Sequence, residues 1–137
     1  AQFSVGEFGN GMKMKLVANL LVAIHNVSTA EAILFGQQLG LQAKAIVEVV
    51  ADGAGGSRMF QVRGPMMASR GWDDATMKIE VWQKDMEVIG QMAKSVNCPT
   101  PLFQTAASIY TAAMAQGLSQ EDTASTAEVF AKMAGIP

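Results

Sequence analysis

Near the start of the chain, glycines, a lysine and an asparagine have the residue types and the spacing needed for acid–base chemistry. In the stretch GEFGNGMKMKLVAN, the last glycine is Gly11, Lys15 follows four residues later, and Asn19 follows after four more. Glycines at the start of a helix let a ligand approach free backbone N–H groups. Residues four apart lie on the same helix face. An anion-binding turn, an ammonium group and an amide would therefore meet at one place.

A lysine at this position could transfer protons. The positive end of a helix and partial burial both favour the neutral amine, which can act as a general base. In the simpler alternative, the glycines only allow a tight start to the helix and Lys15 is a solvated side chain. The spacing alone favours this simpler alternative.

The order of the glycines does not match a nucleotide-binding loop. A Rossmann loop has G-x-G-x-x-G between a strand and a helix, and a Walker A loop has Lys and Ser/Thr directly after its last glycine. Residues 6–11 have the order G-x-x-G-x-G, and no strand–helix–strand pattern follows. The second glycine cluster, GAGGS at 53–57, lacks both a preceding strand and a P-loop lysine. Nucleotide binding by this chain alone is therefore not expected.

Other chemically active side chains are isolated in the sequence. His25 is the only histidine, so we expect it to pack against other residues, and we expect no metal site. Asn26 lies too far along the helix from Lys15 to take part in chemistry, which favours an interhelical hydrogen bond. Arg63 and Arg58 are expected to be ion-paired or solvated, with a cofactor or interdomain contact as the alternative. Cys98 has no neighbouring base, which argues against a nucleophile.

Helical periodicity dominates the chain. From Gly11 to Leu39 the apolar residues recur at helical spacing, which predicts a helix of about 25 residues or more that ends at Gly40. This helix is apolar over much of its circumference, so other helices or a partner chain must cover it.

No later segment alternates polar and apolar residues in the manner of a strand. Further helices are predicted at 41–53, at 57–64 with a stop at Gly64-Pro65, at 76–96, at 101–116 and at 119–133. Asp73 or Asp74 would cap the third of these, and Ser119 would cap the last. The sequence therefore predicts an all-α domain of five or six helices around a long N-terminal helix. Its ten methionines are expected mainly in the core.

Length and composition fit one globular domain over residues 1–137. Half of the residues are hydrophobic, 16% are charged and the net charge is −2, so neither nucleic acid nor an anionic membrane is indicated as a partner. No uninterrupted apolar run reaches the roughly 18 residues of a membrane span. A single cysteine favours a reducing, cytoplasmic setting. The start, without Met and close to a glycine-rich run, suggests one domain of a longer protein.

The chain resembles the β-hydroxyacid dehydrogenases, which include 3-hydroxyisobutyrate dehydrogenase and tartronate semialdehyde reductase. The pattern G-x-x-G-x-G-x-x-x-K-x-x-x-N over residues 6–19 is similar to the catalytic signature of this family. Further similarity lies in segments 29–41, 56–60, 83–86 and 96–122, so the resemblance covers nearly the whole chain.

The resemblance implies a domain and its partners. The family joins an N-terminal Rossmann domain, which binds NAD or NADP, to a C-terminal helical domain, and this chain is similar to the second part only. Residues 1–137 would then form a catalytic and dimerisation domain like a short version of the 6-phosphogluconate dehydrogenase C-terminal domain. The Rossmann domain, a small hydroxy acid and a second copy in a dimer or tetramer would be its partners. The isolated domain would be inactive.

The resemblance also implies site residues. Lys15 matches the catalytic lysine, the general acid/base in the oxidation of a small 3-hydroxy acid to a semialdehyde or in the reverse reaction. Asn19 matches the asparagine that holds the substrate and orients this lysine, and Gly11 would contact the substrate. Lys84 matches the residue that closes over the nicotinamide side of the cofactor. Asp85 would be structural and pair with a nearby cation.

One departure from the family pattern leaves the substrate open. Met77 stands where members of the family often have Phe, and Trp72 is close enough in sequence to compensate. Two other functions remain as alternatives. A non-catalytic helical dimerisation or interaction module would need neither Lys15 nor Lys84, and an imine-reducing relative would usually lack the lysine.

Overall fold

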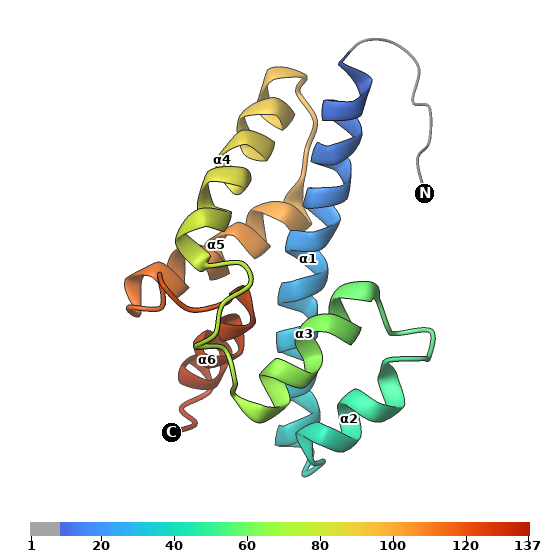
Figure 1. Ribbon diagram of the computed structural model, residues 1–137, viewed down its shortest axis with the longest axis vertical. Coiled ribbons are helices and arrows are strands. Elements are labelled where there is room, and N and C mark those ends of the chain that lie inside the picture. Colours follow the sequence, from blue (N-terminus) through green and yellow to red (C-terminus); the bar gives the residue numbers. More distant parts are fainter. Residues whose placement is uncertain (1–8) are drawn as a thin grey trace.

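The computed structural model describes residues 9–137, which form a bundle of helices around one long helix (Figure 1). Gly6 of the glycine pattern lies outside this part. In chain order the helices are α1 (Asn10–Gln38), α2 (Ala43–Val50), α3 (Arg58–Ser69), α4 (Ile79–Ser95), α5 (Pro101–Ala115), the 3-10 helix η1 (Thr123–Ser125) and α6 (Thr126–Met133). The six α-helices among the described residues, and the absence of strands there, confirm the all-α prediction.

Helix α1 is the axis of the fold, as the periodicity predicts. It has 29 residues, and left-handed glycines flank it, with φ of 90° at Gly9 and 92° at Gly40. Helix α4 runs beside the first half of α1, while α2 and α3 lie beside its second half (Figure 1). The length and hydropathy of α1 would also suit a membrane span. In this fold, α1 packs against α3, α5 and α6, and its buried residues all lie from Ala23 onward.

Helix α3 continues through Gly64-Pro65, so the predicted stop at this pair is wrong. Proline removes one backbone hydrogen bond inside a helix and is unfavourable there. Helix α3 packs on α2 along this stretch. Gly64 is buried, and a Cβ at this position would lie 3.4 Å from Val47 Cγ2. Pro65 is exposed on the outer surface of the helix.

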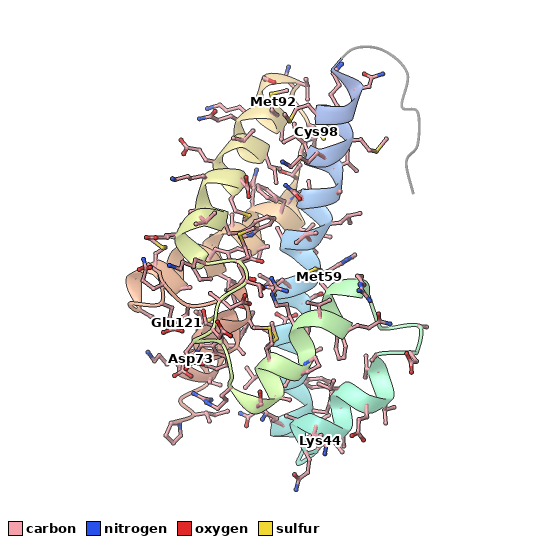
Figure 2. The ribbon with its side chains drawn as sticks, in the orientation of Figure 1. Lys44, Met59, Asp73, Met92, Cys98 and Glu121 are labelled. Carbon is pink, nitrogen blue, oxygen red and sulfur yellow. The ribbon has the colours of Figure 1, made fainter. Side chains whose placement is uncertain are left out.

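The predicted cap of α4 is also wrong. The helix begins at Ile79, three residues after the predicted start, and no side chain caps it. Instead, the backbone N–H groups of Ile79 and Glu80 donate to the carbonyls of Glu121 (3.0 Å) and Ser119 (3.1 Å). Asp73 lies near Glu121 on the surface (Figure 2). A distant segment of chain thus satisfies helix-terminal donors that the sequence assigned to a local aspartate.

The last helical region begins later than expected. Ser119 does not cap it, because Asp122 does so, accepting a hydrogen bond from Ala124 N at 2.9 Å at the start of η1. Asp122 is fully buried. The sequence placed this residue in the first turn of a helix, where an acid is normally exposed.

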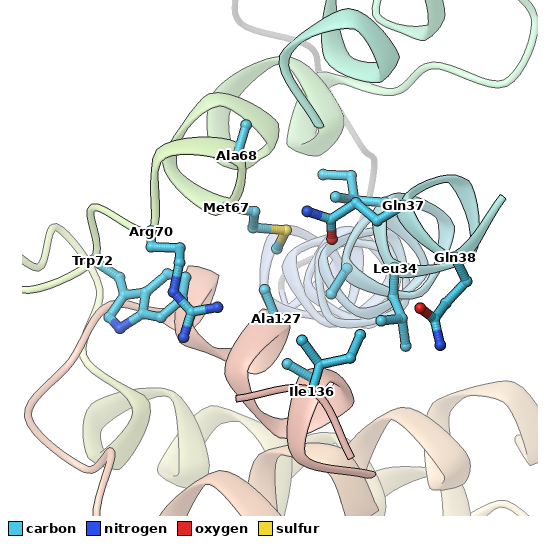
Figure 3. A pocket seen from close by; sticks show the side chains of 12 residues that line it. Leu34, Gln37, Gln38, Met67, Ala68, Arg70, Trp72, Ala127 and Ile136 are labelled. Atoms are coloured by element: carbon cyan, nitrogen blue, oxygen red, sulfur yellow. The ribbon is translucent and has the colours of Figure 1, made fainter. Parts of the chain in front are cut away.

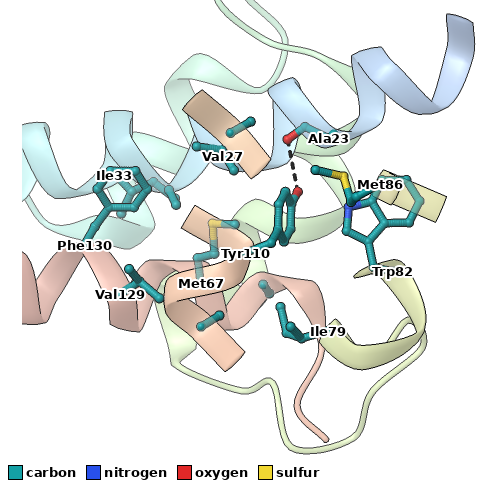
Figure 4. Packing of buried hydrophobic residues seen from close by; sticks show 14 of the residues in the cluster. Ala23, Val27, Ile33, Met67, Ile79, Trp82, Met86, Tyr110, Val129 and Phe130 are labelled. Atoms are coloured by element: carbon teal, nitrogen blue, oxygen red, sulfur yellow. Dashed lines mark hydrogen bonds between the residues drawn. The ribbon is translucent and has the colours of Figure 1, made fainter. Parts of the chain in front are cut away.

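The core is centred on Tyr110 of α5, which is fully buried (Figure 4). Its hydroxyl donates to Ala23 O of α1 at 3.0 Å, and Asn26 Nδ2 donates to the same hydroxyl at 3.0 Å and to Thr123 O at 3.0 Å. The Trp82 ring meets Tyr110 edge-on, with 6.3 Å between centroids. The predicted interhelical hydrogen bond of Asn26 is confirmed. Desolvation by burial raises the pKa of Tyr110 far above its usual value.

The methionines are not mainly in the core. Met67 and Met86 are buried, and Met66 and Met77 pack partly against the core. Five others are exposed, namely Met12, Met14, Met92, Met114 and Met133. Their helical spacing was correct, but spacing alone does not show which face of a helix other elements cover.

Candidate active site

The glycine-rich start of α1 is open. Gly9 is the N-cap residue, has left-handed backbone and offers no side-chain cap, while its carbonyl accepts from Lys13 N at 3.2 Å. A Cβ added at Gly9 or Gly11 would meet no described atom within 4 Å. The first turn of α1 therefore presents backbone N–H groups on a surface that a small molecule can approach.

Lys15 and Asn19 lie one turn apart on the same stretch of α1 and so share a helix face. Lys15 is exposed and Asn19 is half-buried. Residues 9–137 therefore do not provide the expected partial burial of Lys15. Any burial of its ammonium group must come from atoms outside residues 9–137.

Lys84 lies on α4, in the second turn of that helix, and is exposed. It makes no hydrogen bond or ion pair with residues 9–137, and the cation expected beside Asp85 is also absent from this part of the chain. Helices α1 and α4 contact each other, so the two lysines stand on neighbouring helices without a direct polar link. Both ammonium groups are available to bind a group from outside.

Exposed apolar side chains occur on the same first turns of α1 as Lys15. They are Met12, Met14, Val17 and Leu21. A groove of about 270 Å³ lies further along α1, between Leu20 and Ile24 and residues 99–103 at the start of α5. Met92 and Cys98 mark the same end of the molecule (Figure 2). An apolar surface of this kind next to a lysine is typical of a site completed by another domain or chain.

Trp72 does not lie near the start of α1. It lines a cavity of about 320 Å³ together with Leu34 and Gln37, near the last turns of α1 (Figure 3). The Arg70 guanidinium is 5.3 Å from the centre of its ring and is ion-paired with Glu128. Leu34 is 19 residues from Lys15, or about 28 Å along the helix. The expectation that Trp72 compensates for the missing Phe is therefore not supported.

Met77, which stands in place of that Phe, is half-buried and packs against the core. Its backbone is held at both ends, because its N–H donates to Asp122 Oδ2 at 3.1 Å and its carbonyl accepts from Thr123 N at 2.9 Å. The position is thus rigid, whatever its side chain contacts outside this chain.

Arg63 forms a buried ion pair with Asp122; the sequence allowed an ion pair for Arg63 but indicated no partner. Arg63 Nε lies 2.8 Å from Asp122 Oδ1 and donates to Thr123 Oγ1 at 3.2 Å, which confirms an ion pair for Arg63. Arg58 is exposed, and within residues 9–137 it bonds only to the nearby Gln61. A buried arginine requires a carboxylate partner, but nothing in the sequence pointed to Asp122.

Comparison with known proteins identifies the family. The sequence profile described as the NAD-binding domain of NADP-dependent 3-hydroxyisobutyrate dehydrogenase matches residues 9–130. The chain belongs to this family. The chloroplastic glyoxylate/succinic semialdehyde reductase 2 of Arabidopsis thaliana is 38% identical over 93% of the chain, and an L-threonate dehydrogenase of Haemophilus influenzae is 30% identical over 93%.

Solved structures of 3-hydroxyisobutyrate dehydrogenases have the same fold. The Salmonella typhimurium structure superposes on 88% of the chain with a TM-score of 0.84 and 26% identity. The Mycobacterium tuberculosis structure superposes on 93% of the chain with a TM-score of 0.82 and 21% identity, which supports the fold alone. The chain spans 36% and 42% of the length of the two curated relatives, and 42% of the Salmonella structure.

Proposed function

We propose that this chain is the C-terminal helical domain, residues 1–137, of an NAD- or NADP-dependent β-hydroxyacid dehydrogenase. The observation that carries the proposal is the placement of Lys15 and Asn19 on one face at the open, glycine-rich start of α1, in a chain of this family. By their names, its relatives act on small semialdehydes and hydroxy acids. The proposed substrate is a small 3-hydroxy acid or the matching semialdehyde, in line with the 3-hydroxyisobutyrate in the description of the family.

The residues of this chain can contact one side of a dinucleotide, but they do not form a complete dinucleotide-binding site. Lys84 offers an exposed ammonium group without a partner in residues 9–137, which suits a polar or anionic part of the cofactor. No phosphate-binding glycine loop occurs in the sequence. NAD or NADP, when bound, takes the hydride from the carbinol carbon or returns it. A Rossmann domain supplies most of its binding site.

Lys15 moves the proton in this reaction. In the oxidative direction, its neutral amine accepts the proton of the substrate hydroxyl as the hydride leaves the same carbon. In the reductive direction, its ammonium group returns the proton to the carbonyl oxygen. Asn19 donates a hydrogen bond to the reacting oxygen or orients Lys15. Gly11 leaves room for the substrate, because no side chain stands in front of it.

The apolar surface around Lys15 favours additional partners. The Rossmann domain of the same protein covers the site and excludes water from it, and a second copy of the chain forms a dimer or tetramer. Without these covers Lys15 remains exposed, so the isolated domain is inactive. The single cysteine favours a cytoplasmic location.

The same surface supports a second candidate, a non-catalytic dimerisation module. Met12, Met14 and Val17 are all more than half exposed, as an interface helix would require. This candidate gives no reason for an unpaired Lys84 on α4, so we rank it second.

The test is to express the full-length protein and to assay a panel of small 3-hydroxy acids and semialdehydes with both cofactors. We expect turnover of at least one substrate pair with NAD or NADP, and none by residues 1–137 alone. A protein that has no strand followed by G-x-G-x-x-G upstream of Ala1 and no turnover would contradict the proposal and favour the dimerisation module.

A further inference from the structure

The carboxylate of Asp122 is the most heavily hydrogen-bonded side chain among the described residues, and it is fully buried. Its Oδ1 atom accepts from Arg63 Nε (2.8 Å) and Ala124 N (2.9 Å). Its Oδ2 atom accepts from Thr76 N (3.0 Å), Thr76 Oγ1 (3.1 Å) and Met77 N (3.1 Å). One carboxylate therefore joins helix α3, the segment before α4 and the start of η1.

Backbone hydrogen bonds extend this connection to the first turn of α4. Asp122 N donates to Trp72 O at 2.8 Å, and Ile79 N donates to Glu121 O at 3.0 Å. Because no side chain caps α4, the carbonyls of Glu121 and Ser119 are the acceptors for its first N–H groups, and they help to fix its start. Any change that moves Asp122 also moves the start of α4.

Two helices that carry the proposed site depend on this connection. Lys84 lies five residues after the first residue of α4, about 7.5 Å along the helix, so a shift or rotation of that end is passed on to its side chain. Arg63 belongs to α3, which packs against α1, the helix of Lys15. The Arg63–Asp122 pair thus sets the start of α4 relative to the helix that bears the proposed general base.

We propose that Asp122, oriented by Arg63, is a positioning residue that holds α4 in the register in which Lys84 meets the cofactor. This inference rests on the proposed function, since it requires the contact between Lys84 and the dinucleotide. Asp122 itself touches no reactant. A fully buried carboxylate is costly to desolvate and needs several donors, and here its donors come from three separate segments.

The test measures the dissociation constants of NADH and NADPH for the full-length protein, by following the fluorescence of the reduced cofactor. In Asp122→Asn, the amide must point its NH₂ group either at the Arg63 guanidinium or at the donors of the Thr76 segment. We expect cofactor binding to weaken roughly tenfold or more, while kcat at saturating cofactor stays within about threefold. Thr76→Val removes only the hydroxyl bond at an exposed position, so it should fold normally and weaken binding about threefold.

A matched control comes from the same pair of segments. Lys78 Nζ donates to Gln120 Oε1 at 3.0 Å on the exposed surface, so Lys78→Ala removes a contact between these segments but leaves the carboxylate intact. Its cofactor affinity should equal that of the wild type. Hydrogen exchange provides a readout independent of activity. The amides of Met77, Ile79 and Glu80 should exchange faster in Asp122→Asn and Thr76→Val but not in Lys78→Ala.

Lys84→Ala separates the two ways in which the inference could fail. If Lys84→Ala weakens cofactor binding and folded Asp122→Asn and Thr76→Val do not, the positioning role is overturned and the proposed function stands. If Lys84→Ala binds cofactor as tightly as the wild type, the proposed role of Lys84 is overturned, and the inference with it. If Lys78→Ala and Thr76→Val weakened cofactor binding equally, the inference would also be overturned. That result would mean that any contact between the two segments positions α4, and that the Asp122 carboxylate has no special role.

Discussion

Two asparagines on helix α1 have opposite surroundings. Asn19 and Asn26 are seven residues apart, close to two full turns, so they lie on nearly the same face of one helix. Asn19 is half-buried beside exposed apolar residues, whereas Asn26 is 1% exposed and donates to Tyr110, Thr123 and Thr126. Asn19 therefore belongs to the candidate site, whereas Asn26 belongs to the core.

The difference between the two asparagines shows that the two halves of α1 have different roles. The buried residues of α1 all lie from Ala23 onward, so the buried polar groups there must find partners within the chain. The first half keeps Lys15 and its apolar neighbours open, so it depends on atoms from elsewhere. Substitutions in the first half should therefore alter function, and those in the second half should alter stability.

The largest expected effect is the loss of turnover in Lys15→Ala. In the full-length enzyme, kcat should fall about 10²- to 10⁴-fold, as expected for the loss of a general acid/base. The melting temperature should not change, because Lys15 makes no hydrogen bond or ion pair with residues 9–137. Lys13→Ala is the control, because Lys13 is also an exposed lysine in the first turns of α1. This variant should keep wild-type activity. Substantial turnover by Lys15→Ala would rule out its proposed role.

The second prediction compares the two asparagines directly. Asn26→Ala removes the donor to Tyr110 Oη and Thr123 O and leaves a small cavity, so it should lower the free energy of unfolding by about 2–4 kcal/mol. Its turnover per folded molecule should persist. Asn19→Ala should do the reverse, with lower kcat and an unfolding free energy within about 0.5 kcal/mol of wild type. Urea denaturation and steady-state kinetics measure both. Equal losses of unfolding free energy in Asn19→Ala and Asn26→Ala would contradict the different roles of the two halves of α1.

Glycines extend the comparison to the backbone. A Cβ at Gly36, in the covered half of α1, would lie 2.4 Å from Ile46 Cδ1, so Gly36→Ala must push α2 away or force Ile46 into another rotamer. We expect a loss of about 1–3 kcal/mol in unfolding free energy. Gly11→Ala meets no described atom and should gain up to about 1 kcal/mol from helix propensity. The same Gly11→Ala change should raise the substrate KM. Thermal unfolding of both variants distinguishes the two outcomes.

The smallest effect is a pH dependence that belongs to the covered half alone. Burial raises the pKa of Tyr110, so the folded state keeps its proton at a pH where an unfolded tyrosine, with a pKa of about 10, loses it. The stability from Tyr110 is therefore complete below about pH 10 and declines above it, by at most about 1.4 kcal/mol per pH unit. Tyr110→Phe lacks this decline. Its stability deficit against wild type should shrink between pH 9 and pH 11 in urea titrations, and a constant deficit would contradict the assignment.

The helices could be predicted where local pattern and packing agree. The extent of α1 follows from its apolar spacing and from Gly40, because a left-handed residue ends a helix by a local rule. The start of α4 could not be predicted, because its donors bond to carbonyls of residues 119–121, more than 35 positions away. The same holds for α3, which continues through Gly64-Pro65 while it packs against α1 and α2.

The candidate site divides in the same way. The sequence by itself determined the all-α class, the family resemblance and the spacing of Lys15 and Asn19, because these depend on residues a few positions apart. Only the tertiary structure decided which methionines are exposed, that Trp72 lies at the far end of α1, and that Asp122 is buried with Arg63. Burial and long-range hydrogen bonds depend on which elements meet in space, and the order of residues along one chain does not state that directly.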